Sequence, residues 1–98
     1  YPRIDFLILA MNQLVNHLDK LEEMSHGDYK PKVIIRTKIG SKRPLNAGPQ
    51  HTQDHYMAFE WMLQNIFVVK VLSVESIMPV YKAAIKRPRS TLIIEALD

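Results

Sequence analysis

Three short apolar segments rich in β-branched residues alternate with helical stretches, and this alternation constrains the fold more than any other feature of the sequence. The segments lie at residues 32–36, 66–72 and 91–95. Their apolar residues are continuous rather than alternating with polar ones, which is typical of strands buried on both faces of a parallel sheet. Helices that connect parallel strands cover the two faces of such a sheet. The sequence therefore predicts a three-layer α/β/α fold with three parallel strands.

Helical patterns fill the spaces around these strands. Apolar residues recur every three or four positions over residues 7–21, and Asp5 is placed to cap the helix that this pattern predicts. A second helix is expected at residues 55–64. A third is expected from Ser73 to a break at residues 87–90. Helices and strands therefore alternate along the whole chain.

The chain has 98 residues, which suits one small domain or part of a larger one. It has no cysteine, so a disulfide framework and a thiolate metal site are excluded and a reducing compartment is favoured. The longest apolar run, residues 6–11, is about a third of a bilayer-spanning helix, and no secretory signal is recognisable. We therefore expect a cytoplasmic protein without a membrane segment. Because Tyr1 leads directly into a helix, we also expect an internal piece of a longer protein.

The charge balance is mildly basic, with 13 Lys and Arg residues against 10 Asp and Glu and a formal net charge of +3. This excess is too small to indicate nucleic-acid binding. Two basic clusters, at residues 38–43 and 82–89, could bind phosphate groups or nucleic acid. No aromatic residues interleave with them, so a base-stacking platform is missing. We expect a solvated face or a subunit contact at these clusters, and no nucleic-acid partner.

The densest group of polar side chains lies in the long segment between the first strand and the second helix, at residues 47–55. Ligands of open α/β sheets bind beyond the carboxyl ends of strands, and this segment follows such an end. It places Gln50, His51 and Gln53 just before a helix start, whose free N–H groups attract polar ligands. A histidine there can transfer a proton near neutral pH. The alternative is that these side chains only satisfy the turn before the helix.

His51 and His55 are four residues apart, a spacing that would put both on one face of a helix and can suit a metal ion. A third ligand is not evident. Asp54 points elsewhere at this spacing, and His17 and His26 are remote in the sequence. We therefore expect no metal site in this chain.

The segment Gly48-Pro-Gln-His-Thr-Gln53 is similar to the Gly-x-Gln-His-Ser-Gln loop in the beta subunits of 2-oxo acid dehydrogenases, including the pyruvate, branched-chain and acetoin enzymes. Other segments resemble that family in the same order and at nearly the same spacing. They are Met11-Asn-Gln-Leu-Val-Asn16, Val33-Ile-Ile-Arg36, Val68-Val69 with Lys82-Ala-Ala-Ile85, and Leu92-Ile-Ile-Glu95. The resemblance covers nearly all of residues 1–98. It implies the second half of a pyrimidine-binding domain of the transketolase-like superfamily.

In that family the domain forms half of a thiamine diphosphate site at an interface with a partner. The resemblance therefore implies a fragment of a thiamine-diphosphate-dependent oxidoreductase, one that decarboxylates a 2-oxo acid. Through the relatives in the transketolase group, a sugar ketol is the alternative substrate class. His51 would be its catalytic residue, for substrate binding or proton transfer. Gln50 and Gln53 would shape the substrate loop, and Arg36 would support it. The partner domain would hold magnesium, so a homo- or hetero-oligomer with an alpha-type chain is implied.

The sequence also departs from the family. The family's catalytic glutamate, which protonates the aminopyrimidine, lies upstream of the first helix, and no glutamate of this chain matches its position. The potassium-binding turn is replaced by Lys86-Arg-Pro-Arg89, and the glycine-rich loop carries Lys42, Arg43 and Pro44 where small residues are usual. We therefore expect the isolated chain to be inactive. The alternative function is a non-catalytic binding or assembly module that retains the fold.

Overall fold

A parallel three-stranded sheet forms the middle of the molecule in the computed structural model, which describes residues 1–97. Its strands are β1 (Ile34–Lys38), β2 (Phe67–Val71) and β3 (Thr91–Glu95), in the order β1-β3-β2. Both outer strands run parallel to β3, with Ile34 and Phe67 each in register with Thr91. The three predicted parallel strands are confirmed. β1 lies two residues later than expected, because its last residues, up to Lys38, pair with the end of β3.

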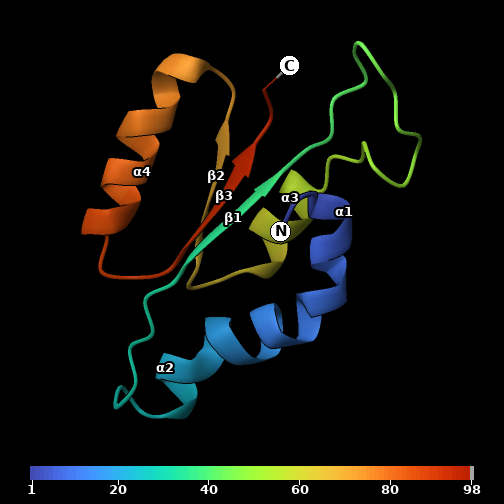
Figure 1. The fold of residues 1–98 in the computed structure, drawn as a ribbon. Coiled ribbons are helices and arrows are strands. Elements are labelled where there is room, and N and C mark those ends of the chain that lie inside the picture. Colours follow the sequence, from blue (N-terminus) through green and yellow to red (C-terminus); the bar gives the residue numbers. More distant parts are fainter. Residues whose placement is uncertain (98) are drawn as a thin grey trace.

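Helices cover both faces of this sheet (Figure 1). The N-terminal helical run and α3 (Tyr56–Met62) lie on one face. On the other face lies α4 (Ile77–Lys86), which follows a 3₁₀ turn at Val74–Ser76. The three-layer α/β/α fold expected from the sequence is confirmed.

The central strand β3 supplies side chains to both layers of the core. Residues 91–94 are all buried, and successive side chains of a strand point to opposite faces. Leu92 and Ile94 pack in the larger core with residues of the N-terminal helix and α3, whereas Ile93 packs with Ala84 of α4. The continuous apolar pattern of this strand therefore follows from its two covered faces.

The N-terminal helical run changes its winding several times. Its segments are α1 (Ile4–Leu7), a 3₁₀ turn (Ile8–Ala10), a π-helical stretch (Asn12–His17), a second 3₁₀ turn (Leu18–Lys20) and α2 (Leu21–Met24). Its apolar stripe still faces the sheet, since Ile4, Leu7 and Leu14 are buried. The sequence predicted one regular helix, because 3₁₀, α and π turns all bring apolar residues three to five apart onto one face.

The expectation that Asp5 caps this helix is wrong. Arg3 occupies the capping position, and its side chain makes no capping hydrogen bond. Asp5 lies inside the first turn, where its Oδ1 accepts hydrogen bonds from the backbone N and the Nε2 of Gln53 at 3.1 and 3.0 Å. The local capping rule failed because a segment distant in the sequence offers the carboxylate two donors.

The other helices are short. α3 begins at Tyr56 and ends at Met62, inside the expected range of 55–64, because Leu63 is extended and the following N–H groups bond to Asp19 instead. α4 has 10 residues. Within residues 1–97, no helix has both the length and the apolar character needed to cross a membrane.

Candidate functional site

The polar loop identified in the sequence forms a closed turn where the chain returns to the carboxyl end of β1. Gly48 starts this turn with φ +101°, a left-handed conformation that favours glycine. Its carbonyl oxygen accepts hydrogen bonds from the His51 N–H at 3.1 Å and from the Thr52 hydroxyl at 3.0 Å. The two hydrogen bonds hold residues 48–52 in one compact conformation.

Three contacts fasten this turn to the rest of the fold. The Nη1 of Arg3 donates a hydrogen bond to the carbonyl oxygen of His51 at 3.1 Å. Asp5 holds Gln53, as described above. Gly40, just after β1, approaches so closely that a Cβ atom there would lie 1.9 Å from the His51 carbonyl oxygen. The backbone around His51 is therefore fixed between the end of β1 and the start of α1.

The imidazole of His51 packs edge-on against the ring of Phe6. The two ring centroids are 5.4 Å apart and the ring planes are inclined by 70°. His51 is half-buried, and Phe6 is 40% exposed. An imidazole that is held by packing and remains open to solvent can exchange a proton with a bound small molecule.

The two glutamines of the loop have different surroundings. The side chain of Gln53 donates to the buried carboxylate of Asp5, so it fastens the loop. Gln50, which is exposed like Gln53, lies within the turn that starts at Gly48 and makes no such contact with Asp5. The side chain of Gln53 is therefore held by the fold, whereas that of Gln50 faces solvent.

His51 and His55 do not share a helix face, because α3 begins only at Tyr56. His51 lies in the preceding turn, and His55 occupies the capping position of α3. The Nε2 atom of His55 is buried, and no residue in the described part of the chain hydrogen-bonds to it. Across residues 1–97, no group of three or more His, Cys, Asp or Glu side chains is arranged to hold a metal ion.

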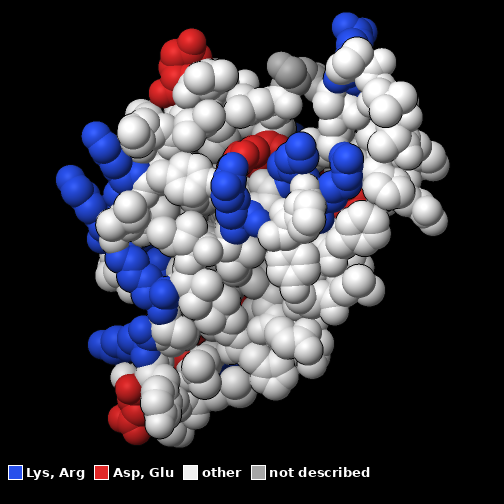
Figure 2. Space-filling view, viewed as in Figure 1, with Lys and Arg blue, Asp and Glu red and all other residues white. Residues whose placement is uncertain are grey.

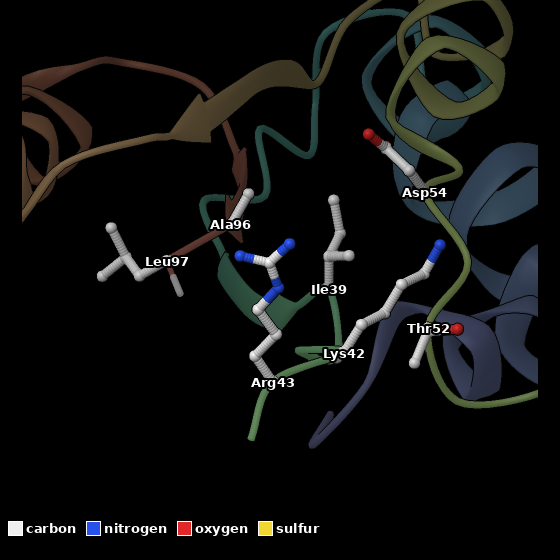
Figure 3. Close-up of a pocket in the computed structure, with 8 residues that line it drawn as sticks. Ile39, Lys42, Arg43, Thr52, Asp54, Ala96 and Leu97 are labelled. Carbon is white, nitrogen blue, oxygen red and sulfur yellow. The ribbon is translucent and has the colours of Figure 1, made fainter. Parts of the chain in front are cut away.

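A cavity of about 510 Å³ lies beside the loop, at the same edge of the sheet (Figure 3). Its volume falls within the range of about 300–1,000 Å³ that is usual for small-molecule sites. Apolar side chains that follow β1 and β3 line one part, and the loop and the segment after β1 line the rest. The labelled side chains are Ile39, Ala96, Leu97, Thr52, Asp54, Lys42 and Arg43.

The acidic side chain of this cavity, Asp54, is paired with a lysine that the sequence analysis missed. Lys70 of β2 forms an ion pair with Asp54 Oδ2, and the backbone N of Tyr56 donates to Oδ1 at 3.0 Å. Burial acts to raise the pKa of Asp54, but the hydrogen bonds from Lys70 and Tyr56 outweigh it and the pKa is lowered. Asp54 is therefore ionised at neutral pH, and the ammonium group of Lys70 balances its charge. The available sequence signal was a single lysine inside an otherwise apolar strand.

Arg36 is structural, as expected, but it ties strands together rather than supporting the loop. Its Nε and Nη2 donate to the carboxylate of Glu95 at 2.6 and 3.4 Å. The hydroxyl of Tyr81 donates to the same carboxylate at 2.7 Å. Arg36, Glu95 and Tyr81 therefore link β1, β3 and α4 on the side of the sheet opposite α3.

Comparisons with known proteins find that no family model matches this sequence and that no curated protein matches it. The resemblance to the 2-oxo acid dehydrogenases therefore rests on the quoted segments alone.

The structure brings Gln50, His51 and Gln53 together at one edge of the sheet. It adds Arg3, Asp5 and Gly40 as the residues that hold them there.

Proposed function

We propose that this chain is part of a thiamine-diphosphate-dependent enzyme that decarboxylates a 2-oxo acid, and that it forms the wall of the active site carrying His51. The observation that carries the proposal is the fixed loop at residues 48–53, held at the carboxyl end of a parallel sheet. Ligands of open α/β sheets bind at that end. The similarity of this loop to the family's histidine loop supports the same assignment.

The residues present fit part of such a cofactor site. The rings of Phe6 and His51 lie together at the sheet edge, and such groups can pack against and hydrogen-bond to a pyrimidine ring. The carboxylate next to the loop, Asp5, holds Gln53 through Oδ1, and its Oδ2 is buried without a hydrogen-bond partner among the described residues. In this proposal, the carboxylate that activates the pyrimidine and the ligands of magnesium come from outside these residues.

When bound, thiamine diphosphate supplies a nucleophilic carbon that adds to the carbonyl group of a 2-oxo acid. In the proposed site, His51 binds the substrate or moves a proton at its imidazole. Gln50 contacts the substrate, and Gln53 keeps the loop in place through Asp5. An alpha-type chain or domain completes the site, so activity needs an oligomer. A cytoplasmic location belongs to the same proposal.

The test is a kinetic comparison of two histidine variants in the full-length protein. We expect His51→Ala to lower kcat by about 10²–10⁴, the usual contribution of a positioned proton-transfer group, with little change in the Kd for thiamine diphosphate. The matched control is His55→Ala. His55 caps α3 and has a buried ring nitrogen, so this variant should lower the melting temperature and change kcat far less.

The proposal fails if His55→Ala damages turnover more than His51→Ala does. It also fails if His51→Ala loses activity only through weaker cofactor binding. A full-length protein without any cofactor-dependent decarboxylation would favour the non-catalytic module instead.

A further inference from the structure

The two basic clusters of the sequence have different environments. Figure 2 shows Lys and Arg side chains along the α4 side of the molecule, a further group in the middle of this face beside acidic side chains, and a few on the loop after β1. In the cluster near α4, the guanidinium groups of Arg87 and Arg89 lie over the ring of Phe67, at 3.8 and 5.6 Å from its centroid. Arg87 also donates to the hydroxyl of Thr91 at 2.9 Å. These arginines are therefore engaged in packing.

Lys42 and Arg43, in contrast, line the cavity at the carboxyl end of the sheet. In Figure 3 the guanidinium of Arg43 extends toward Ala96 and Ile39, and the side chain of Lys42 extends toward the segment that carries Thr52 and Asp54. Both cationic side chains therefore line the same cavity, and both belong to the loop that follows β1.

The charge of this cavity is not balanced within the described chain. The ion pairs formed among residues 1–97 are Lys20–Asp19, Arg36–Glu95 and Lys70–Asp54, and none involves Lys42 or Arg43. The carboxylate that lines the cavity, Asp54, is already neutralised by Lys70. Together with Lys70, the lining therefore carries a net charge of +2, which favours an anionic ligand.

The segment that carries the two cations is held in place. The hydroxyl of Ser41 accepts a hydrogen bond from the Arg43 N–H at 3.0 Å and donates one to the Arg43 carbonyl at 2.6 Å. One residue earlier, the backbone of Gly40 packs against the carbonyl of His51. A loop fixed at both points loses less conformational freedom when a ligand binds.

We propose that this cavity binds a small organic anion. Its carboxylate or phosphate group pairs with Lys42 and Arg43, for which the planar guanidinium of arginine is well shaped. Its apolar part lies against Ile39, Ala96 and Leu97. This site is independent of the proposed catalytic role of His51, whose ring packs on Phe6 and does not line the cavity.

The test uses four probes with the chain at constant ionic strength, followed by isothermal titration and by backbone amide chemical shifts. Butyrate and butyl phosphate carry the anionic group and an apolar part, inorganic phosphate lacks the apolar part, and butanol lacks the charge. We expect at least one of the two organic anions to bind, more tightly than inorganic phosphate and butanol. The amide shifts should be confined to residues 39–43, 52–54 and 96–97, and the preferred anion identifies the ligand class.

Charge variants complete the test. Removing both cations with Lys42→Ala and Arg43→Ala should weaken the affinity for the organic anion by about tenfold or more, the usual effect of losing charge-assisted hydrogen bonds. Arg43→Lys, which keeps the charge, should retain most of the binding. The matched control, Lys82→Ala with Lys86→Ala on the exposed side of α4, should leave the affinity unchanged.

Either of two results would overturn the proposal. One is the absence of binding by both organic anions. The other is binding that the α4 control weakens as much as the cavity variant does, since this would reflect the net charge of the chain and not a site.

Discussion

The carboxylate of Asp19 is buried and accepts hydrogen bonds from three successive backbone N–H groups, those of Gln64, Asn65 and Ile66, at 2.8–3.2 Å. Burial acts to raise its pKa. The hydrogen bonds from Lys20 and from the three N–H groups outweigh this effect, so the pKa of Asp19 lies below its ordinary value. The ionised carboxylate therefore stabilises the link between the N-terminal helix and the segment that leads into β2.

We expect Asp19→Asn to lower the free energy of unfolding by about 1–3 kcal/mol near pH 7, because an amide cannot satisfy all the buried N–H groups. The folded pKa lies below the unfolded value of about 3.9, so the contribution of Asp19 is complete above about pH 4 and is lost as the pH falls through the folded pKa. The difference between the wild type and the variant should therefore shrink below about pH 4. Urea unfolding at several pH values measures this difference.

The control for this prediction is Asp28→Asn, since Asp28 is exposed after the turn that follows α2. This variant should change the free energy of unfolding little at any pH. A difference between wild type and Asp19→Asn that stays constant into the acid range would contradict the role assigned to the charge of Asp19.

Local residue patterns identified the His51 loop but not the residues that hold it. The polar residues of this loop follow directly after Gly48 and Pro49, so the whole motif is visible as one continuous segment of the sequence. Arg3 and Asp5 lie 48 residues from the atoms they contact. Helix-capping rules describe neighbours along the chain only, so they assigned Asp5 to its own helix. The position of the candidate loop could therefore be predicted from the sequence, but the residues that hold it could not.

At the scale of elements, Glu95 joins the end of β3 to β1 through Arg36 and to α4 through Tyr81. The hydrogen bond from Arg36 is the main cause that lowers the pKa of Glu95. Burial, followed by the hydrogen bond to Glu95, raises the pKa of Tyr81 to about 12. The tyrosine hydroxyl thus reports on contact between α4 and the sheet.

We expect Glu95→Gln to lower the pKa of Tyr81 below 12 while leaving it above the ordinary value of about 10, because the negative charge is removed and the burial remains. Ultraviolet titration of the tyrosines measures this change, and Tyr81→Phe assigns the signal. The matched control is Glu75→Gln, an exposed glutamate just before α4. An unchanged Tyr81 titration in Glu95→Gln would show that the two side chains are not in contact.

The sequence predicted the bounds of the strands well, but it did not predict their order in the sheet. Continuous apolar segments placed all three strands within two residues of their observed bounds, since burial on both faces leaves a clear pattern. The order β1-β3-β2 was not predicted. It depends on which strands pair, and the sequence pattern of each strand describes only its own two faces. The changes between 3₁₀, α and π winding in the N-terminal helix were missed for a similar reason. The spacing of apolar residues shows which side of a helix is buried, but it does not show the number of residues per turn.

At the scale of the whole molecule, many large apolar side chains remain exposed. Leu9 is 84% exposed on the N-terminal helix, and Trp61 is 90% exposed on α3. Ile34 of the edge strand β1 is 37% exposed. Exposed apolar patches and open strand edges favour association with another chain.

We therefore expect the 98-residue chain to self-associate or to require a partner. Sedimentation velocity over a range of concentrations should show a rising average mass. Leu9→Lys and Trp61→Lys should each reduce that rise. The control is Lys82→Leu, which adds an apolar side chain at an exposed position of α4. Its average mass, compared with that of the wild type, tests whether added apolar surface alone drives association. A monomer at all concentrations with a cooperative thermal transition would contradict the expectation.

The strand in the middle of the sheet is the last of the three in the sequence. Within residues 1–97, β1 and β2 each pair with β3 and not with each other, so neither meets this partner before β3 has left the ribosome. The described three-stranded sheet can form only after residue 95 has emerged, so until then β1 and β2 lack the strand that lies between them. Such intermediates are prone to aggregate and are substrates for chaperones. Because of this strand order, we expect the growing chain to need protection from aggregation until β3 is complete.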